Sequence, residues 1–338
     1  MRHFPRLLAA VLFALYLTAP LRAADADFLP GVKRILFLGD SITYSGQYVD
    51  AFETFLFLRF PARQFEVINV GLPSETVSGL SEDGHAGGQF PRPDLHERLD
   101  RVLAKTKPDL IFACYGMNDG IYLPFDEGRF AKFRDGIERL RAKAQAAGAQ
   151  IIHLTPPTFH PLSARNQPGA DGKAPATTLG GYNEVLDRYA AWLLEQRAKG
   201  WRVIDIHGPM NAFIEEQRKT NPDFVFAGDG VHANDAGHML MAEQIIAGLA
   251  PSEMKFWHKL DGFDPDGNGE WWLDEKRFAA CRETIRQRGR ILADAWLTDT
   301  GHTRPGMAKG LPLAEAKTQA AALEKQIRDE AKQIAPRP

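Results

Sequence analysis

Short apolar runs alternate with helical patterns through most of the chain, and this alternation restricts the fold more than any other feature. Each run is short and nearly continuous, as expected for a strand that is buried on both faces. The runs lie at 35–38, 65–70, 110–115, 151–155 and 201–206. Helical patterns lie at 47–60, 94–105, 129–147, 182–199 and 234–249. Strands that alternate with helices predict an α/β fold whose parallel sheet is covered by helices on both faces.

The first apolar run ends in Gly39, Asp40 and Ser41, which predict a tight turn with a hydroxyl at its tip. Gly39 allows the backbone to bend without a Cβ clash, and the following helix N-terminus favours an anion or a developing oxyanion. Ser41 is therefore a candidate nucleophile. Alone, the triplet is more often an ordinary helix cap, and it is not a GxSxG elbow because position 43 is Thr.

Further residues that could act together with Ser41 lie after predicted strands or just before a predicted helix. Gly71 and Asn118 follow the second and third runs, and Asp229 and His232 precede the last helix of the sheet region. Sites in parallel sheets lie at the carboxyl ends of the strands, so these residues can converge. Asp229 can fix the tautomer of His232, whose other ring nitrogen can then take a proton from Ser41. Singly each residue is more often structural, but together they indicate a catalytic site.

A tetrahedral intermediate also needs donors for its oxyanion. The sequence offers the backbone N–H groups of Ser41 and Gly71 and the side-chain amide of Asn118.

Four blocks of the sequence resemble the SGNH hydrolases, also called the GDSL esterase/lipase family. The blocks are GDSI at 39–42, Gly71, GMND at 116–119 and DGVH at 229–232. The resemblance covers about residues 34–249 and implies a flavodoxin-like three-layer α/β/α sandwich with strand order 2-1-3-4-5. It also implies ester hydrolysis through an acyl-serine, with no cofactor for catalysis. The implied catalytic residues and oxyanion donors are those deduced above.

Residues 1–26 have the order of a secretory signal peptide: a positively charged start, an apolar run at 7–17 and small residues at 23–26. The apolar run is shorter than the ~20 residues of a spanning helix, which disfavours a membrane anchor. We therefore expect a periplasmic or extracellular protein without a membrane partner after cleavage. A formal net charge of −2 and the absence of a Lys/Arg run disfavour nucleic acid as a partner.

The expected partner is a small-molecule or polysaccharide ester. Exported family members with aromatic and polar cleft loops often remove O-acetyl groups from carbohydrate, so the resemblance favours that substrate. Tyr44, Glu75 and Tyr122 are the candidate substrate-binding residues, within a rim that also contains His85, Phe90 and Arg92. A lysophospholipase or thioesterase is the alternative enzyme, and a non-catalytic carbohydrate-binding protein is the alternative from another class. The oligomeric state stays open.

The predicted hydrolase domain spans 29–250, and a helical C-terminal extension spans 251–338. In the extension, residues 264–275 have the spacing of an EF-hand calcium loop. The candidate ligands of a structural Ca²⁺ are Asp264, Asp266, Asn268, Glu270 and Glu275. Against this, Trp272 stands where an oxygen ligand is usual and a second loop is lacking, so a turn without metal remains the alternative.

A helix is expected at 313–334, with an apolar stripe that would dock on its own domain or, alternatively, form a dimer seam. His302 and Arg304 could reach the cleft, although a surface linker is the simpler interpretation. Cys114 and Cys281 are expected to be two separate buried thiols rather than a disulfide.

Overall fold

The computed structural model describes residues 28–159, 181–260 and 275–334. Its centre is a five-stranded parallel sheet with strand order β2-β1-β3-β4-β5. The strands are β1 (Arg34–Gly39), β2 (Glu66–Asn69), β3 (Leu110–Cys114), β4 (Gln150–Leu154) and β5 (Arg202–Ile204). This sheet confirms the predicted α/β fold and the strand order that the family resemblance implied.

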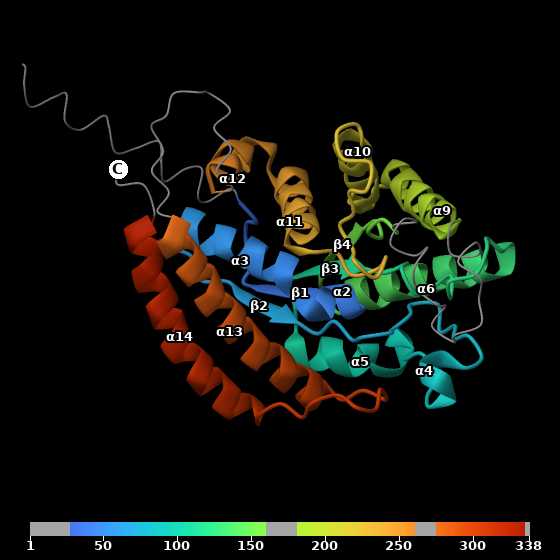
Figure 1. Cartoon of the computed structure of the whole chain (residues 1–338). Helices are drawn as coiled ribbons and strands as arrows, with labels where there is room; N and C mark the ends of the chain where they lie inside the picture. The colour runs from blue at the N-terminus through green and yellow to red at the C-terminus, as the bar shows by residue number, and fades with distance from the viewer. Residues whose placement is uncertain (1–27, 160–180, 261–274, 335–338) are drawn as a thin grey trace, which may run out of the picture.

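Helices surround the sheet (Figure 1). Those of the sheet region are α2 (Ser41–Ser45), α3 (Gln47–Arg59), α4 (His85–Gly88), α5 (Leu95–Thr106), α6 (Glu127–Ala146), α9 (Tyr182–Glu195), α10 (His207–Arg218) and α11 (Asp235–Leu249). Helices α3 and α11 pack together on one face, whereas α5 and α6 pack on the other. Helix α6 also stacks Phe133 on Tyr189 of α9, with 4.2 Å between the ring centroids. The sheet is therefore the middle layer of three.

The strands form the core because their side chains are apolar on both faces. Ile35, Leu36, Phe37 and Leu38 of β1 are all 0% exposed. Phe37 stacks on Phe112 of β3 at a centroid distance of 5.0 Å. Full burial of each such side chain contributes about 1.5–3 kcal/mol, so the central strands contribute substantially to the stability of the fold.

The C-terminal extension contains α12 (Met254–Leu260), α13 (Glu275–Thr300) and α14 (Leu313–Ile334). Helix α13 packs against α3, β2 and α14 (Figure 1). Ile327, Ala331 and Ile334 of α14 are buried, so the apolar stripe docks on the same chain, as expected. A buried ion pair, Arg288 to Glu53 at 2.8 Å, ties α13 to α3.

Two elements differ from the sequence analysis. Helix α10 was not predicted, and Gly208 and Pro209 lie near its start. Proline is tolerated in the first helical turn, where its missing N–H would have no intrahelical partner. The sequence of the extension also predicts a helix over 276–292, whereas α13 continues to Thr300. Cys114 and Cys281 are buried and free, which confirms the prediction of two separate thiols.

The predicted signal peptide at 1–26 lies outside the described residues. Within the described ranges, none of the helices combines the length and apolarity needed to span a membrane.

Candidate active site

Helix α2 carries the serine and starts directly after β1. Asp40 caps this helix, since its Oδ1 accepts a hydrogen bond from the N–H of Ile42 at 2.9 Å. Gly39 has no room for a side chain: an added Cβ would lie 2.1 Å from Thr43 Oγ1 and 2.7 Å from the carbonyl oxygen of Cys114. The tight turn therefore depends on glycine, and it leaves Ser41 at the first position of a helix.

Ser41, His232 and Asp229 form a continuous hydrogen-bonded chain. His232 Nε2 lies 2.7 Å from Ser41 Oγ, and His232 Nδ1 lies 2.5 Å from Asp229 Oδ2. The other carboxylate oxygen, Oδ1, accepts the backbone N–H groups of Val231 at 2.9 Å and His232 at 2.8 Å. The carboxylate is thus held in place by its own loop. This is the arrangement of a nucleophile, a general base and an orienting acid.

The electrostatics of this chain suit proton transfer. The hydrogen bond with Asp229 is the largest influence on His232 and raises the pKa of its imidazole against the opposing effect of burial. Burial would raise the pKa of Asp229, but the hydrogen bonds from His232 and Val231 outweigh it and lower that pKa well below its usual range. Asp229 therefore stays ionised beside an imidazole that gains basicity from it.

Asp40 is a second carboxyl group at this site, and the sequence analysis assigned it no role there. It is 3% exposed, and burial raises its pKa to about 7, against the opposing hydrogen bond from Ile42 and the charge of His232. Its place in the sequence suggested only a helix cap, and the structure confirms that cap.

Three donors were expected for an oxyanion, and their surroundings differ. The N–H of Ser41 is at the first position of α2, where helix geometry provides no carbonyl partner. Asn118 is 4% exposed, and its Nδ2 donates to the carbonyl oxygen of Glu75 at 3.1 Å. An amide nitrogen has two protons, so one remains for a ligand.

Gly71 packs directly against the serine helix: an added Cβ would lie 2.4 Å from the Tyr44 nitrogen and 2.8 Å from Thr43 Cβ. Its N–H donates to Asn69 Oδ1 at 2.9 Å. Asn69 in turn donates from Nδ2 to the Thr43 carbonyl at 2.6 Å. The N–H of Gly71 is therefore occupied, contrary to the expectation of a free donor. The sequence analysis did not identify Asn69 as a partner of Gly71, because it placed Asn69 only within the predicted strand at 65–70.

The structure corrects the prediction that Glu75 binds the substrate. It is 0% exposed, and its carboxylate accepts two hydrogen bonds from Arg98, at 2.6 and 2.8 Å, and one from Tyr115 at 2.7 Å. A buried carboxylate with these partners cannot contact a sugar. Arg92, another rim residue, is likewise buried and paired through two 2.6 Å hydrogen bonds with Glu82.

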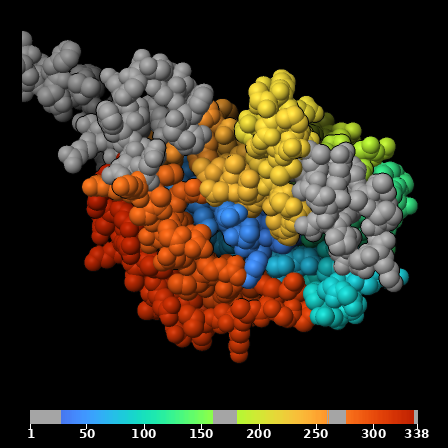
Figure 2. Space-filling model, in the orientation of Figure 1, coloured from blue at the N-terminus to red at the C-terminus, as the bar shows by residue number. Residues whose placement is uncertain are grey.

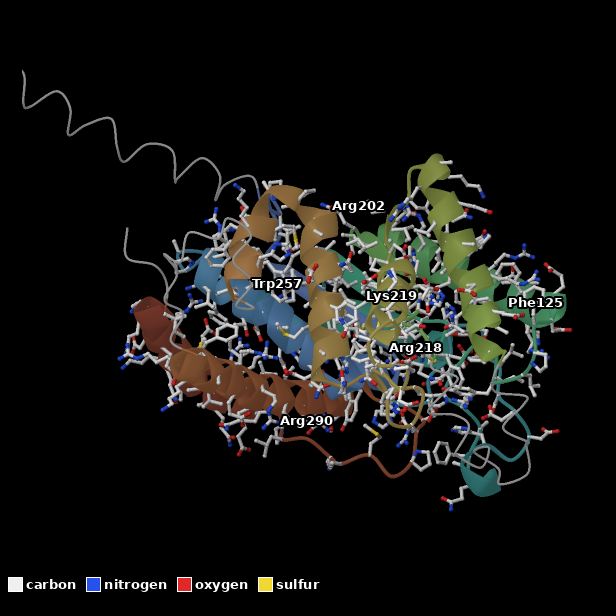
Figure 3. All side chains as sticks on the ribbon, turned by 45° about the horizontal axis from the view of Figure 1, so that its top comes forward. Phe125, Arg202, Arg218, Lys219, Trp257 and Arg290 are labelled. Carbon is white, nitrogen blue, oxygen red and sulfur yellow. The ribbon has the colours of Figure 1, made fainter. Side chains whose placement is uncertain are left out.

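Tyr44 lies on α2, at the rim of the site, and is partly exposed. Arg290 of α13 stacks over its ring, 4.1 Å from the centroid, and also donates a hydrogen bond to its hydroxyl oxygen. Figure 3 labels this arginine on α13. The C-terminal extension thus contacts the helix that carries Ser41, a relationship that the sequence did not reveal.

Arg304 comes from the segment after α13, and its guanidinium lies 5.3 Å from the centre of the Phe90 ring. This segment therefore contacts a residue of the expected rim and is more than a surface linker. In the space-filling view, blue atoms of the chain's first described part lie in a hollow bordered by yellow, red and cyan segments (Figure 2). Chain regions that are far apart in the sequence form the walls around the serine helix.

A metal was expected only in the C-terminal extension. Asp264, Asp266, Asn268 and Glu270 lie outside the described residues, and Glu275 begins α13. Among the residues that are described, His, Cys, Asp and Glu form no group of three or more that could hold a metal ion. The calcium loop therefore stays a prediction.

Comparison with known families defines the class. Residues 37–240, more than half of the chain, match the GDSL-like Lipase/Acylhydrolase family. The chain belongs to this family, and the members of this family are hydrolases that act on ester bonds. A comparison with curated protein sequences finds no match.

Solved structures show the same fold. BT4096, described as a gut microbial diltiazem-metabolizing enzyme, is 21% identical with a TM-score of 0.52, and the match covers 65% of this chain and 48% of that one. The chain therefore spans about half the length of that protein.

Two acetylxylan esterases are also similar. A catalytic mutant of Axe2 from Geobacillus stearothermophilus is 21% identical with a TM-score of 0.44, and the match covers 64% of this chain and 94% of that one. AlAXEase is 19% identical with a TM-score of 0.45, and the match covers 64% of this chain and 99% of that one. Both scores lie below 0.5, so neither structure supports a particular substrate.

Proposed function

We propose that this protein is an exported serine esterase that hydrolyses carboxylic esters through an acyl-serine intermediate. The observation that carries the proposal is the hydrogen-bonded chain from Ser41 through His232 to Asp229, with contacts of 2.7 and 2.5 Å. A hydroxyl within this distance of a basic imidazole can lose its proton as it attacks a carbonyl carbon.

In the first half of the reaction, Ser41 Oγ bonds to the ester carbon and its proton moves to His232 Nε2. Asp229 stabilises the resulting imidazolium. The carbonyl oxygen becomes an oxyanion, for which the Ser41 N–H and the remaining Asn118 Nδ2 proton are the donors. When the intermediate collapses, His232 gives its proton to the departing alcohol, and the acyl group stays on Ser41.

In the second half, water replaces the alcohol. His232 Nε2 takes one water proton, and the hydroxyl attacks the acyl carbon. The bond to Ser41 Oγ then breaks, Ser41 recovers its proton, and the acid leaves. For Gly71 to serve as a third oxyanion donor, its N–H would have to turn from Asn69 Oδ1, which it contacts at 2.9 Å.

For the substrate, we favour O-acetyl groups on carbohydrate. A partly exposed aromatic ring at the rim supports this, because sugar rings commonly stack on aromatic faces. Tyr44 has this position beside Ser41, and Arg290 covers part of its ring at 4.1 Å from the centroid. Export through residues 1–26 would bring the enzyme to extracellular or periplasmic polysaccharide. Sequencing the N-terminus of the secreted protein tests the export.

Hydrolysis of p-nitrophenyl acetate tests the activity. Ser41→Ala should reduce kcat by about 10⁴-fold or more, because the nucleophile is lost. Ser45→Ala is the matched control, since this serine is on the same helix and its Oγ donates to the Ile42 carbonyl at 2.7 Å. The control should retain wild-type activity. Equal rates for the wild type and Ser41→Ala would refute the proposal.

A substrate panel tests the acyl group and the acceptor. Acetate release from acetylated glycans, compared with hydrolysis of long-chain acyl esters, separates a carbohydrate acetylesterase from a lysophospholipase or thioesterase. Glycan binding without turnover would instead support a non-catalytic binding protein.

A further inference from the structure

Two adjacent residues near Asn118 have a backbone conformation that side chains other than glycine rarely adopt. Ile121 has φ of 48° and Tyr122 has φ of 56°. For a β-branched residue such as Ile121 this is an outlier. Backbone strain of this kind persists only where the surroundings enforce it, and it is frequent at functional sites.

The strained turn brings the Tyr122 hydroxyl to Asn118. This hydroxyl donates to Asn118 Oδ1 at 3.1 Å. The ring has two close neighbours: it stacks on Tyr182 with a centroid distance of 4.9 Å, and the Arg92 guanidinium lies 5.3 Å from its centre. Tyr122 is therefore fixed by packing as well as by its backbone.

Tyr182 also holds the turn that carries Asn118. Its hydroxyl donates to the carbonyl oxygen of Met117 at 2.8 Å and accepts the N–H of Gly120 at 3.1 Å. An added Cβ at Gly120 would lie 2.6 Å from this hydroxyl, so the turn fits closely around it. Residues on both sides of Asn118 are thus anchored, and its side chain is oriented separately.

The orientation of a carboxamide is decided by its partners, because its oxygen accepts and its nitrogen donates. The Tyr122 hydroxyl is a donor to the oxygen end, and the Glu75 carbonyl is an acceptor for the nitrogen end at 3.1 Å. With both partners present, the second Nδ2 proton of Asn118 is available for an oxyanion. A reversed amide would present its oxygen to the negative charge and oppose the reaction.

We propose that Tyr122 is a positioning residue, whose hydroxyl holds the Asn118 amide with Nδ2 directed to the oxyanion. This rests on the proposed function, which makes Asn118 an oxyanion donor. It also gives Tyr122 a different role from the expected one of binding the substrate.

Tyr122→Phe tests the proposal, because it removes the hydroxyl and keeps the ring that contacts Tyr182 and Arg92. With p-nitrophenyl acetate, kcat should fall about tenfold while KM stays the same, since the lost stabilisation concerns the transition state. In an Asn118→Ala background, Tyr122→Phe should cause no further loss, because the amide that it orients is absent.

Tyr189→Phe is the control. Tyr189 is a buried tyrosine whose ring, like that of Tyr122, is stacked: it lies 4.2 Å from Phe133, and its variant should keep the wild-type kcat. The melting temperature of each variant reports whether it is folded.

Two results would overturn the role of Tyr122: a rise in KM with kcat unchanged, or an equal loss of kcat with and without Asn118. If the variants show either result while the wild type hydrolyses p-nitrophenyl acetate, the proposed function still stands. A wild type without this hydrolysis refutes the proposed function, and the role of Tyr122 with it.

Discussion

His232 Nε2 and Ser41 Oγ lie 2.7 Å apart, although 191 positions separate the two residues in the sequence. The parallel sheet accounts for this, because the turn after β1 and the loop before α11 meet at one edge. Because of this contact, Ser41 can transfer its proton to His232 only while the imidazole is neutral.

Activity should therefore depend on pH through His232. A general base must be neutral, and Asp229 raises the pKa of His232, so activity should fall as the pH drops through a value above the ordinary histidine pKa of about 6.5. In Asp229→Asn the raising influence is lost. The acidic limb of the kcat/KM profile should then move to lower pH, and kcat should fall by about 10²- to 10⁴-fold. An acidic limb at the same pH in both proteins would contradict this.

The buried pair of Arg98 and Glu75 should matter for stability. The two side chains are 1% and 0% exposed and contact at 2.6 Å. Arg98→Met leaves a buried carboxylate unpaired, so the free energy of unfolding in urea should fall by about 3–5 kcal/mol. Adding Glu75→Gln should restore part of the loss, because glutamine is neutral and still accepts the Tyr115 hydroxyl. An Arg98→Met variant as stable as the wild type would be inconsistent with this prediction.

Tyr44 should affect the binding of a carbohydrate ester more than the chemistry. Tyr44→Ala removes the stacking ring, so KM for an acetylated oligosaccharide should rise about tenfold, the equivalent of ~1.4 kcal/mol. The KM for p-nitrophenyl acetate, which has no sugar, should change little. Steady-state kinetics with both substrates measures this. Equal effects on both would indicate that Tyr44 acts by supporting α2.

Calcium should bind to the 264–275 loop with a measurable heat in titration calorimetry, and the signal should be lost in Asp264→Ala. EDTA should lower the melting temperature if the ion stabilises the extension, while leaving esterase activity unchanged, because no catalytic step uses a metal. The absence of heat with the wild-type protein would favour a simple turn.

The sequence predicted the residues whose placement follows from local order. The strands were evident because their apolar runs need two covered faces, and Ser41, Asp229 and His232 because each stands beside an element end. Glu75 was misassigned because nothing nearby in the sequence identifies Arg98 as its partner. Arg290 was missed for the same reason: its contact with Tyr44 spans 246 positions. Such pairings depend on how the helices dock, which local patterns do not encode.

The position of α13 has a consequence beyond catalysis. Strand β2 is an outer member of the sheet, and α13 packs against it. Uncovered outer strands readily recruit strands from other molecules, which leads to aggregation. The extension therefore shields the sheet from intermolecular pairing, and a shortened chain lacking α13 should lose solubility as well as its link to the serine helix.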